Sequence, residues 1–135
     1  MSEDHEILVE RLFEAFNRRD AAEIAAVCDE GMEFYPEATA EAVGRSAPYV
    51  GGDGLREYMA DTARVWEELQ ITPGDVEQRG ERLLVRGRAY ARSRELGIRD
   101  IPVAWIWQLR NGRFIRGQVY LDAEEAAEHF SAAVA

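Results

Sequence analysis

Lysine is absent from this 135-residue chain, and all 16 of its basic residues are arginines. Schiff-base chemistry, covalent attachment of pyridoxal and a Walker-type phosphate loop all require a lysine, so these functions are excluded. The 26 acidic residues leave a net charge of -10, which repels phosphate backbones and anionic membrane surfaces. We therefore expect no nucleic acid and no membrane as a partner.

Cysteine and histidine are also scarce. Cys28 is the single cysteine, so no intrachain disulfide can form, and we expect it as a small buried residue. The two histidines, His5 and His129, lie at opposite ends of the chain, and no HExxH or paired-cysteine spacing is present. No metal and no cofactor are therefore predicted. The acidic chain start and the lack of a long apolar run favour a cytoplasmic protein.

The residues that are present predict one compact domain over residues 1–135, because 47% hydrophobic content suffices for one core. Apolar spacing and capping residues predict helices over residues 4–18, after Asp20, over 53–69 with Asp53 as N-cap, and after Asp122 with Val134 on the apolar side. Alternation and the Asn111-Gly112 turn predict strands over 32–35, 82–93, 101–110 and 113–121. Residues 37–52 are interpreted as a loop, and Pro73-Gly74-Asp75 as a break. This order of elements indicates an α+β fold.

Four short motifs occur in the order and spacing of a known family. They are Phe16-Asn17-Arg18-Arg19-Asp20, Tyr49-Val50-Gly51-Gly52-Asp53-Gly54-Leu55-Arg56, Asn111-Gly112-Arg113 and Tyr120-Leu121-Asp122. With them the chain resembles the SnoaL-like, polyketide cyclase-like branch of the nuclear transport factor 2 superfamily. The resemblance implies a cystatin-like cone, in which helices pack in a curved, mixed and mostly antiparallel sheet around a deep apolar pocket. Because this superfamily contains isomerases, dehydratases, epoxide hydrolases, cyclases and non-catalytic binders, the fold does not decide the function.

Two side chains of the first predicted strand are candidate catalytic residues. By resemblance to the family's epoxide hydrolases, Glu33 and Tyr35 are expected to face the pocket. Burial beside aromatic rings raises a carboxyl pKa, so Glu33 could act as general acid or base, with Tyr35 hydrogen-bonded to a developing oxyanion. The alternative is that Glu33 lies at the rim or forms a structural ion pair with an arginine.

The same resemblance assigns the ligand pocket to residues of the long helix and the last two strands. These are Trp66, Trp105, Trp107, Val119 and Leu121. Trp105 and Val119 occupy positions where family enzymes carry an essential Asp or His, so the usual catalytic groups are missing. The tryptophans also fit a plain structural core.

Arginines alternate with small residues on the strand over 82–93. Arg86, Arg88 and Arg92 share one face, and the small residues Gly87, Ala89 and Ala91 share the other. We expect the small face to point inward, because a buried and unpaired guanidinium is very costly. With the opposite parity the pocket would be cationic and its ligand an anionic carboxylate.

These observations predict a small-molecule pocket protein that acts on a small apolar or cyclic molecule. One form is a cofactor-independent acid–base enzyme of the isomerase, cyclase or hydratase type. The alternative is a non-catalytic ligand-binding or dimerisation module, and a third reading is a scaffold with a filled core. An open cavity touching Glu33 and Tyr35 favours the enzyme, and an open apolar one the binder. A homodimer is expected through an outer row of the sheet, namely Ile106, Gln108, Gln118 and Tyr120.

Overall fold

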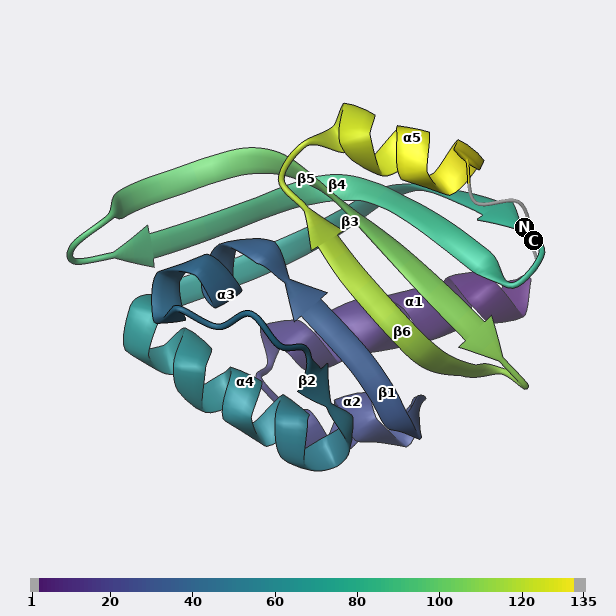
Figure 1. The fold of residues 1–135 in the computed structure, drawn as a ribbon, viewed down its shortest axis with the longest axis horizontal. Helices are drawn as coiled ribbons and strands as arrows, with labels where there is room; N and C mark the ends of the chain where they lie inside the picture. Colours follow the sequence, from purple (N-terminus) through teal and green to yellow (C-terminus); the bar gives the residue numbers. More distant parts are fainter. Residues whose placement is uncertain (1–2, 133–135) are drawn as a thin grey trace.

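In a computed structural model that describes residues 3–132, six strands form one curved sheet (Figure 1). The strands are β1 (Cys28–Pro36), β2 (Tyr49–Val50), β3 (Glu68–Arg79), β4 (Arg82–Ser93), β5 (Gly97–Arg110) and β6 (Arg113–Tyr120). The helices are α1 (Glu3–Asn17), α2 (Ala21–Ala26), α3 (Glu37–Val43), α4 (Gly51–Val65) and α5 (Ala123–Ala132). The ends of the predicted range 1–135, including Val134, lie outside the described residues.

The strand order is β2-β1-β6-β5-β4-β3, with β1 parallel to β6 and the other neighbours antiparallel. Helices cover both faces of this sheet. On the concave side α1 contacts β3 and α4 contacts β1, whereas α5 lies on the opposite face against β4, β5 and β6 (Figure 1). The predicted α+β fold with a curved, mixed and mostly antiparallel sheet is confirmed.

The main core lies on the concave face and is rich in aromatic rings. Trp107 stacks on Phe34 with ring centroids 5.7 Å apart, and Phe13 and Trp105 form a T-shaped pair with centroids 4.8 Å apart. Such pairs contribute beyond the area that they bury. The ring of Trp107 also covers Gly117 on β6, where a Cβ atom would come within 2.1 Å of a ring carbon. Glycine is therefore required at this position by a close approach.

A second, smaller core lies under α5. Phe130 of α5 packs in a buried cluster that contains Ile106 and Tyr120 from the outer face of the sheet. Two of the four residues predicted to form a dimer surface are thus covered within the chain itself. Gln108 is exposed and Gln118 is half-buried. The surface left for a partner copy is therefore smaller and more polar than the four predicted residues suggest.

Several local predictions are confirmed. Asp20 caps α2 by accepting a hydrogen bond from the backbone N–H of Glu23 at 3.0 Å. Asn111 and Gly112 both have positive φ, at 54° and 74°, as a tight type I′ hairpin turn requires. The bounds of β4 are those predicted. Asp122 caps α5 by accepting from the backbone N–H of Glu124 at 2.9 Å.

The predicted loop over residues 37–52 is wrong, because it contains α3, β2 and the start of α4. Gly51, with φ of 64°, lets the chain turn directly from β2 into α4, and a Cβ atom there would lie 2.5 Å from the carbonyl oxygen of Glu30. The N-cap of α4 is therefore Val50, and Asp53 lies in the first helical turn. Cys28 is buried as expected, and it begins β1.

The predicted end of the long helix at Leu69 is also wrong. The helix ends at Val65, and Trp66 already has extended backbone angles. Leu69 belongs to β3, where it pairs with Ala91 of β4, so strand pairing overrides the helical spacing of the apolar residues. The expected break at Pro73 becomes an irregularity between Pro73 and Val76 within β3. β3 is an edge strand, which is where a proline within a sheet is tolerated.

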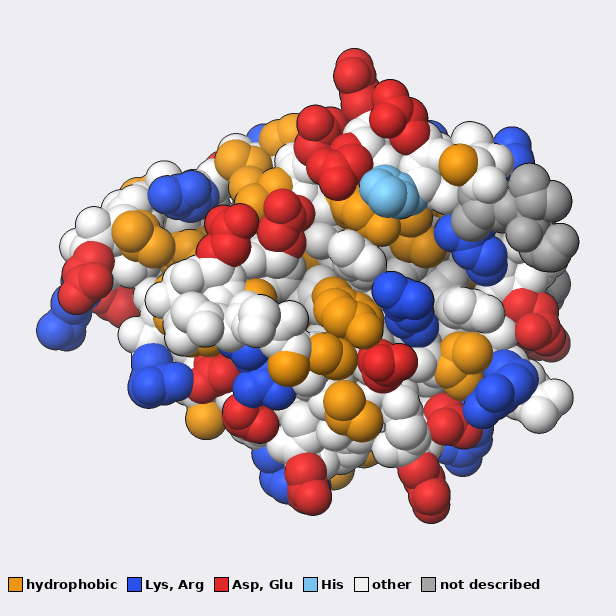
Figure 2. All heavy atoms as spheres, viewed as in Figure 1, with side chains coloured by type: hydrophobic (Ala, Val, Ile, Leu, Met, Phe, Trp, Pro, Cys, Tyr) orange, Lys and Arg blue, Asp and Glu red, His pale blue; other side chains and the backbone are white. Residues whose placement is uncertain are grey.

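Charged side chains of both signs are spread over the face shown in Figure 2. Acidic side chains project from α5, whose first turn carries Glu124 and Glu125 (Figure 2). Arginines are interspersed with acids over the rest of this face, and among the described residues they do not merge into one large basic patch there.

Candidate functional site

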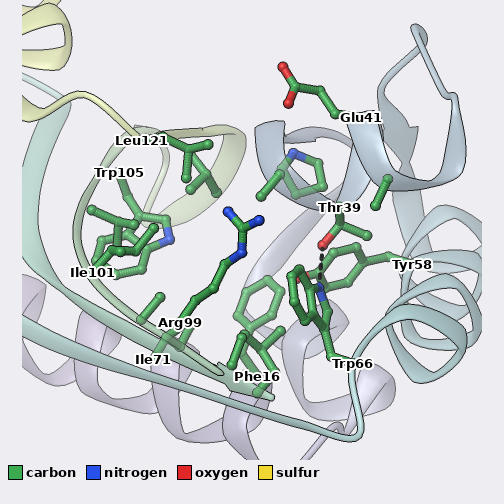
Figure 3. Close-up of a pocket in the computed structure, with 18 of the residues that line it drawn as sticks. Phe16, Thr39, Glu41, Tyr58, Trp66, Ile71, Arg99, Ile101, Trp105 and Leu121 are labelled. Atoms are coloured by element: carbon green, nitrogen blue, oxygen red, sulfur yellow. Dashed lines mark hydrogen bonds between the residues drawn. The ribbon is translucent and has the colours of Figure 1, made fainter. Parts of the chain in front are cut away.

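A cavity of about 320 Å³ lies between the concave face of the sheet, α3 and the end of α4 (Figure 3). This volume is at the lower end of the range for small-molecule sites. Its walls are mostly apolar and aromatic, and the lining residues are Phe16, Phe34, Pro36, Ala38, Thr39, Glu41, Ala42, Tyr58, Trp66, Leu69, Ile71, Ala89, Ala91, Leu96, Arg99, Ile101, Val103, Trp105, Trp107, Val119 and Leu121. Glu41, Leu96 and Arg99 are exposed, so the cavity opens to solvent on their side.

All five residues predicted for the ligand pocket line this cavity. Trp105 and Trp107 come from β5, Val119 from β6, and Trp66 and Leu121 from the chain just after α4 and β6. The β5 and β6 side chains share one face because alternate residues of a strand point to the same side. Trp66 is placed by the extended backbone that ends α4, rather than by a helical stripe.

Glu33 and Tyr35 do not line the cavity, so the orientation predicted for them is wrong. From the same strand Phe34 and Pro36 line it instead. The half-buried Tyr35 hydroxyl lies 3.3 Å from Glu33 Oε2, to which it donates, and the Arg116 guanidinium lies 5.0 Å from the Tyr35 ring centroid. The apolar residues of β1 take the inner positions, because burial there would desolvate a carboxylate at large cost.

The side chains of β4 point as predicted, with the small residues inward and the arginines outward. Ala89 and Ala91 line the cavity. The arginines of β4 point away and form ion pairs on the surface. These pairs are Arg86 with Glu77 at 3.7 Å, Arg88 with Asp100 at 3.1 Å and Arg92 with Glu67 at 2.8 Å.

One cation, however, enters the cavity lining from a different strand. Arg99 lies near the start of β5 and pairs in register with Ala91. Figure 3 shows its guanidinium extending into the middle of the group of lining side chains. The strand predicted from sequence began at Ile101, two residues too late to include it. Continuing the alternation from Trp105 back through Ile101 would have placed Arg99 on the cavity face.

The predicted loop over residues 37–52 gives no place in the cavity to the polar residues of α3. Thr39 is buried, and its Oγ1 accepts a hydrogen bond from the indole N–H of Trp66 at 3.4 Å (Figure 3). Glu41 is exposed at the edge of the cavity. No sequence signal other than the alanine-rich composition of this segment indicated a helix.

Tyr58, on α4, is the buried hydroxyl in the wall. Burial raises its pKa well above the usual value for tyrosine. It therefore stays neutral near pH 7 and cannot serve as a base. The indole N–H of Trp107 is buried and has no hydrogen-bond partner. Apart from the exposed Glu41, the lining residues therefore offer no ionised acceptor.

Within residues 3–132 no group of three His, Cys, Asp or Glu side chains is arranged to hold a metal ion. No helix in this part of the chain is long and apolar enough to cross a membrane.

The curved sheet with a cavity on its concave face defines an NTF2-like fold. An NTF2-like protein of unknown function from Burkholderia pseudomallei superposes with a TM-score of 0.79 at 20% identity, covering 98% of this chain and 100% of that chain. TerC, co-crystallized with polyporic acid, has a TM-score of 0.79 at 19% identity and covers 97% and 100%. A candidate polyketide cyclase from Xanthomonas campestris pv. campestris has a TM-score of 0.73 at 16% identity and covers 91% and 93%.

The sequence itself matches the profile of the SnoaL-like domain over residues 9–117, and the chain belongs to this family. No curated protein matches it in sequence.

Proposed function

We propose that the protein binds a small, largely apolar, ring-containing molecule in the cavity on the concave face of its sheet. The observation that carries this proposal is an open cavity of about 320 Å³ with aromatic and aliphatic walls. Binding sites for small molecules are typically apolar, with a few polar groups that set orientation. The presence of TerC, co-crystallized with polyporic acid, among the proteins of the same fold supports it.

Several observations favour binding over catalysis. Glu33 and Tyr35, the candidate acid–base pair, lie outside the cavity lining. Trp105 and Val119 line the cavity at positions where family enzymes carry catalytic groups. Tyr58 is held neutral by burial. The open cavity itself disfavours a scaffold whose core is filled.

The test is titration with N-phenyl-1-naphthylamine, a neutral probe with three aromatic rings that fluoresces strongly in apolar surroundings. We expect a saturable increase in fluorescence with one probe per chain. Ala89→Phe places a ring in the cavity from a half-buried lining position, so it should abolish saturable binding. Ala60→Phe is the matched control, because Ala60 is exposed on α4 and does not line the cavity.

Two results would contradict the proposal. One is a wild-type protein that gives no saturable signal. The other is an Ala89→Phe variant that remains folded by circular dichroism and binds the probe as the wild type does.

General acid–base chemistry is a second candidate, and it rests on Glu41, the one carboxylate in the lining among the described residues. To distinguish catalysis from binding, a molecule that binds in the cavity is incubated with the protein and then recovered. Chromatography and mass spectrometry show whether it has changed. A product formed by the wild type but not by Glu41→Gln would assign the chemistry to this carboxylate. An unchanged molecule in both would leave binding as the function.

A further inference from the structure

Arg99 stands apart from the arginines around it. On the neighbouring strand and turn, Arg88, Arg92 and Arg94 all form ion pairs with acidic residues, at 3.1, 2.8 and 3.0 Å. The guanidinium of Arg99 has no hydrogen-bond or ion-pair partner among residues 3–132. The chain carries a net charge of -10, so the lack of a partner is not caused by a shortage of acids.

Arg99 is exposed at the opening of the cavity, and its neighbours on the inner side are apolar and aromatic. It shares the cavity face of β5 with Ile101 and Trp105 and takes part in the lining. Figure 3 shows the indole nitrogen of Trp105 on the side that faces the Arg99 guanidinium. Trp105 makes no hydrogen bond through this nitrogen to any described residue. Two free donor groups therefore converge on one apolar space.

The indole N–H of Trp107, by contrast, is not open to the cavity. Trp107 is 1% exposed, and its indole N–H is buried without a hydrogen bond. Burying a donor without an acceptor is costly, and such groups are rare in folded proteins. Thr39 offers an oxygen, but it already accepts from Trp66. The open donors of the cavity are therefore those of Arg99 and Trp105, and they favour a ligand that supplies acceptor oxygens.

From this arrangement we infer that Arg99 anchors an organic anion, and that the ligand class is an aromatic or polycyclic carboxylate. The ring system occupies the apolar part of the cavity, and the carboxylate accepts the two parallel N–H bonds that a guanidinium offers. This inference rests on the proposed binding function, since it specifies which molecules that cavity selects. It makes Arg99 the residue that determines specificity.

The test compares two molecules of nearly equal shape, 2-naphthoate and the neutral 2-naphthamide, by isothermal titration calorimetry at pH 7. The wild type should bind the carboxylate about tenfold more tightly than the amide, as expected for a charge-assisted hydrogen-bonded pair that is partly shielded from water. In Arg99→Gln the ratio of the two affinities should fall to about one. Raising the salt concentration should lower the wild-type ratio as well, since part of the attraction is screened.

Arg94→Gln is the matched control. It removes the same charge from the same hairpin, but the side chain of Arg94 is 90% exposed and does not line the cavity. The affinity ratio should stay at its wild-type value in this variant. A fall equal to that of Arg99→Gln would overturn the inference, because the preference would then reflect general electrostatics.

The outcomes separate the inference from the function on which it rests. Equal wild-type affinity for carboxylate and amide overturns the role of Arg99 while leaving the cavity a binding site. Failure of both molecules and of N-phenyl-1-naphthylamine to bind overturns the proposed function itself. Loss of the preference for the carboxylate in Arg99→Gln, but not in Arg94→Gln, supports both the role of Arg99 and the binding function.

Discussion

Replacing Gly117 with alanine places a methyl group where the ring of Trp107 already lies. A Cβ atom at this position would be 2.1, 2.4 and 2.7 Å from three carbons of the ring, whereas ordinary contacts begin at 3.4 Å. The ring or the β6 backbone would therefore have to move by more than about 1 Å to restore normal packing.

The ring has little room to retreat. Phe34 stacks on it with centroids 5.7 Å apart, Phe114 meets it at 5.4 Å and Phe16 at 6.2 Å. Overpacking of a core usually costs 1–3 kcal/mol, and because the ring is enclosed we expect about 3 kcal/mol for Gly117→Ala. Urea denaturation followed by circular dichroism measures this loss in the free energy of unfolding.

Two further variants test whether the contact with Trp107 causes this loss of stability. Trp107→Phe removes the outer ring atoms, so in that background Gly117→Ala should cost less than about 1 kcal/mol. Gly52→Ala is the control, because its Cβ would meet only an Arg56 nitrogen at 3.7 Å and alanine is the better helix former. A Gly117→Ala loss below about 0.5 kcal/mol, or an equal loss in both backgrounds, would refute the account of this contact.

Three other predictions follow from buried groups and from the sheet surface. The hydroxyl of Tyr49 donates to Asp61 at 2.7 Å and lowers the pKa of that carboxyl, so Tyr49→Phe should cost about 1–2 kcal/mol at pH 7. A lowered folded-state pKa contributes stability above the unfolded value of about 4 and loses it as the pH falls, so this cost should shrink at pH 3, and an equal cost at both pH values would contradict it. Burial raises the pKa of Cys28 to about 12, so its thiol should react with Ellman's reagent at pH 8 only after unfolding, and rapid native labelling would show that it is accessible. A homodimer through the outer sheet face, now limited to the surface around Gln108 and Gln118, should give twice the chain mass in light scattering at micromolar concentration, and a single-chain mass would rule it out.

Local signals in the sequence predicted the elements that depend on local chemistry. Asp20 with Glu23 caps α2, and Asn111-Gly112 makes a hairpin turn, because both rest on residues a few positions apart. The inward parity of Ala89 and Ala91 also followed from the residues alone, since the alternating arginines fit only the outer face.

The predictions that were wrong have a different physical origin, because they depend on pairing between residues far apart in the chain. Leu69 continues the helical spacing of α4, yet its pairing with Ala91 makes it part of a strand. Glu33 was oriented by resemblance to enzymes, whereas Phe34 takes the inner position because the aromatic core there excludes a carboxylate. Arg99 was missed because nothing local shows that β5 extends to Gly97.

The cavity wall contains every tryptophan of the chain. The sequence has 3 tryptophans, and Trp66, Trp105 and Trp107 all take part in the lining. Indole emission depends on the polarity around the ring and is quenched by nearby chromophores. The unlabelled protein therefore reports on this cavity directly, because its tryptophan fluorescence comes wholly from side chains in the cavity wall. A library of coloured aromatic acids can be screened against it directly, without a reporter dye that would compete for the same space.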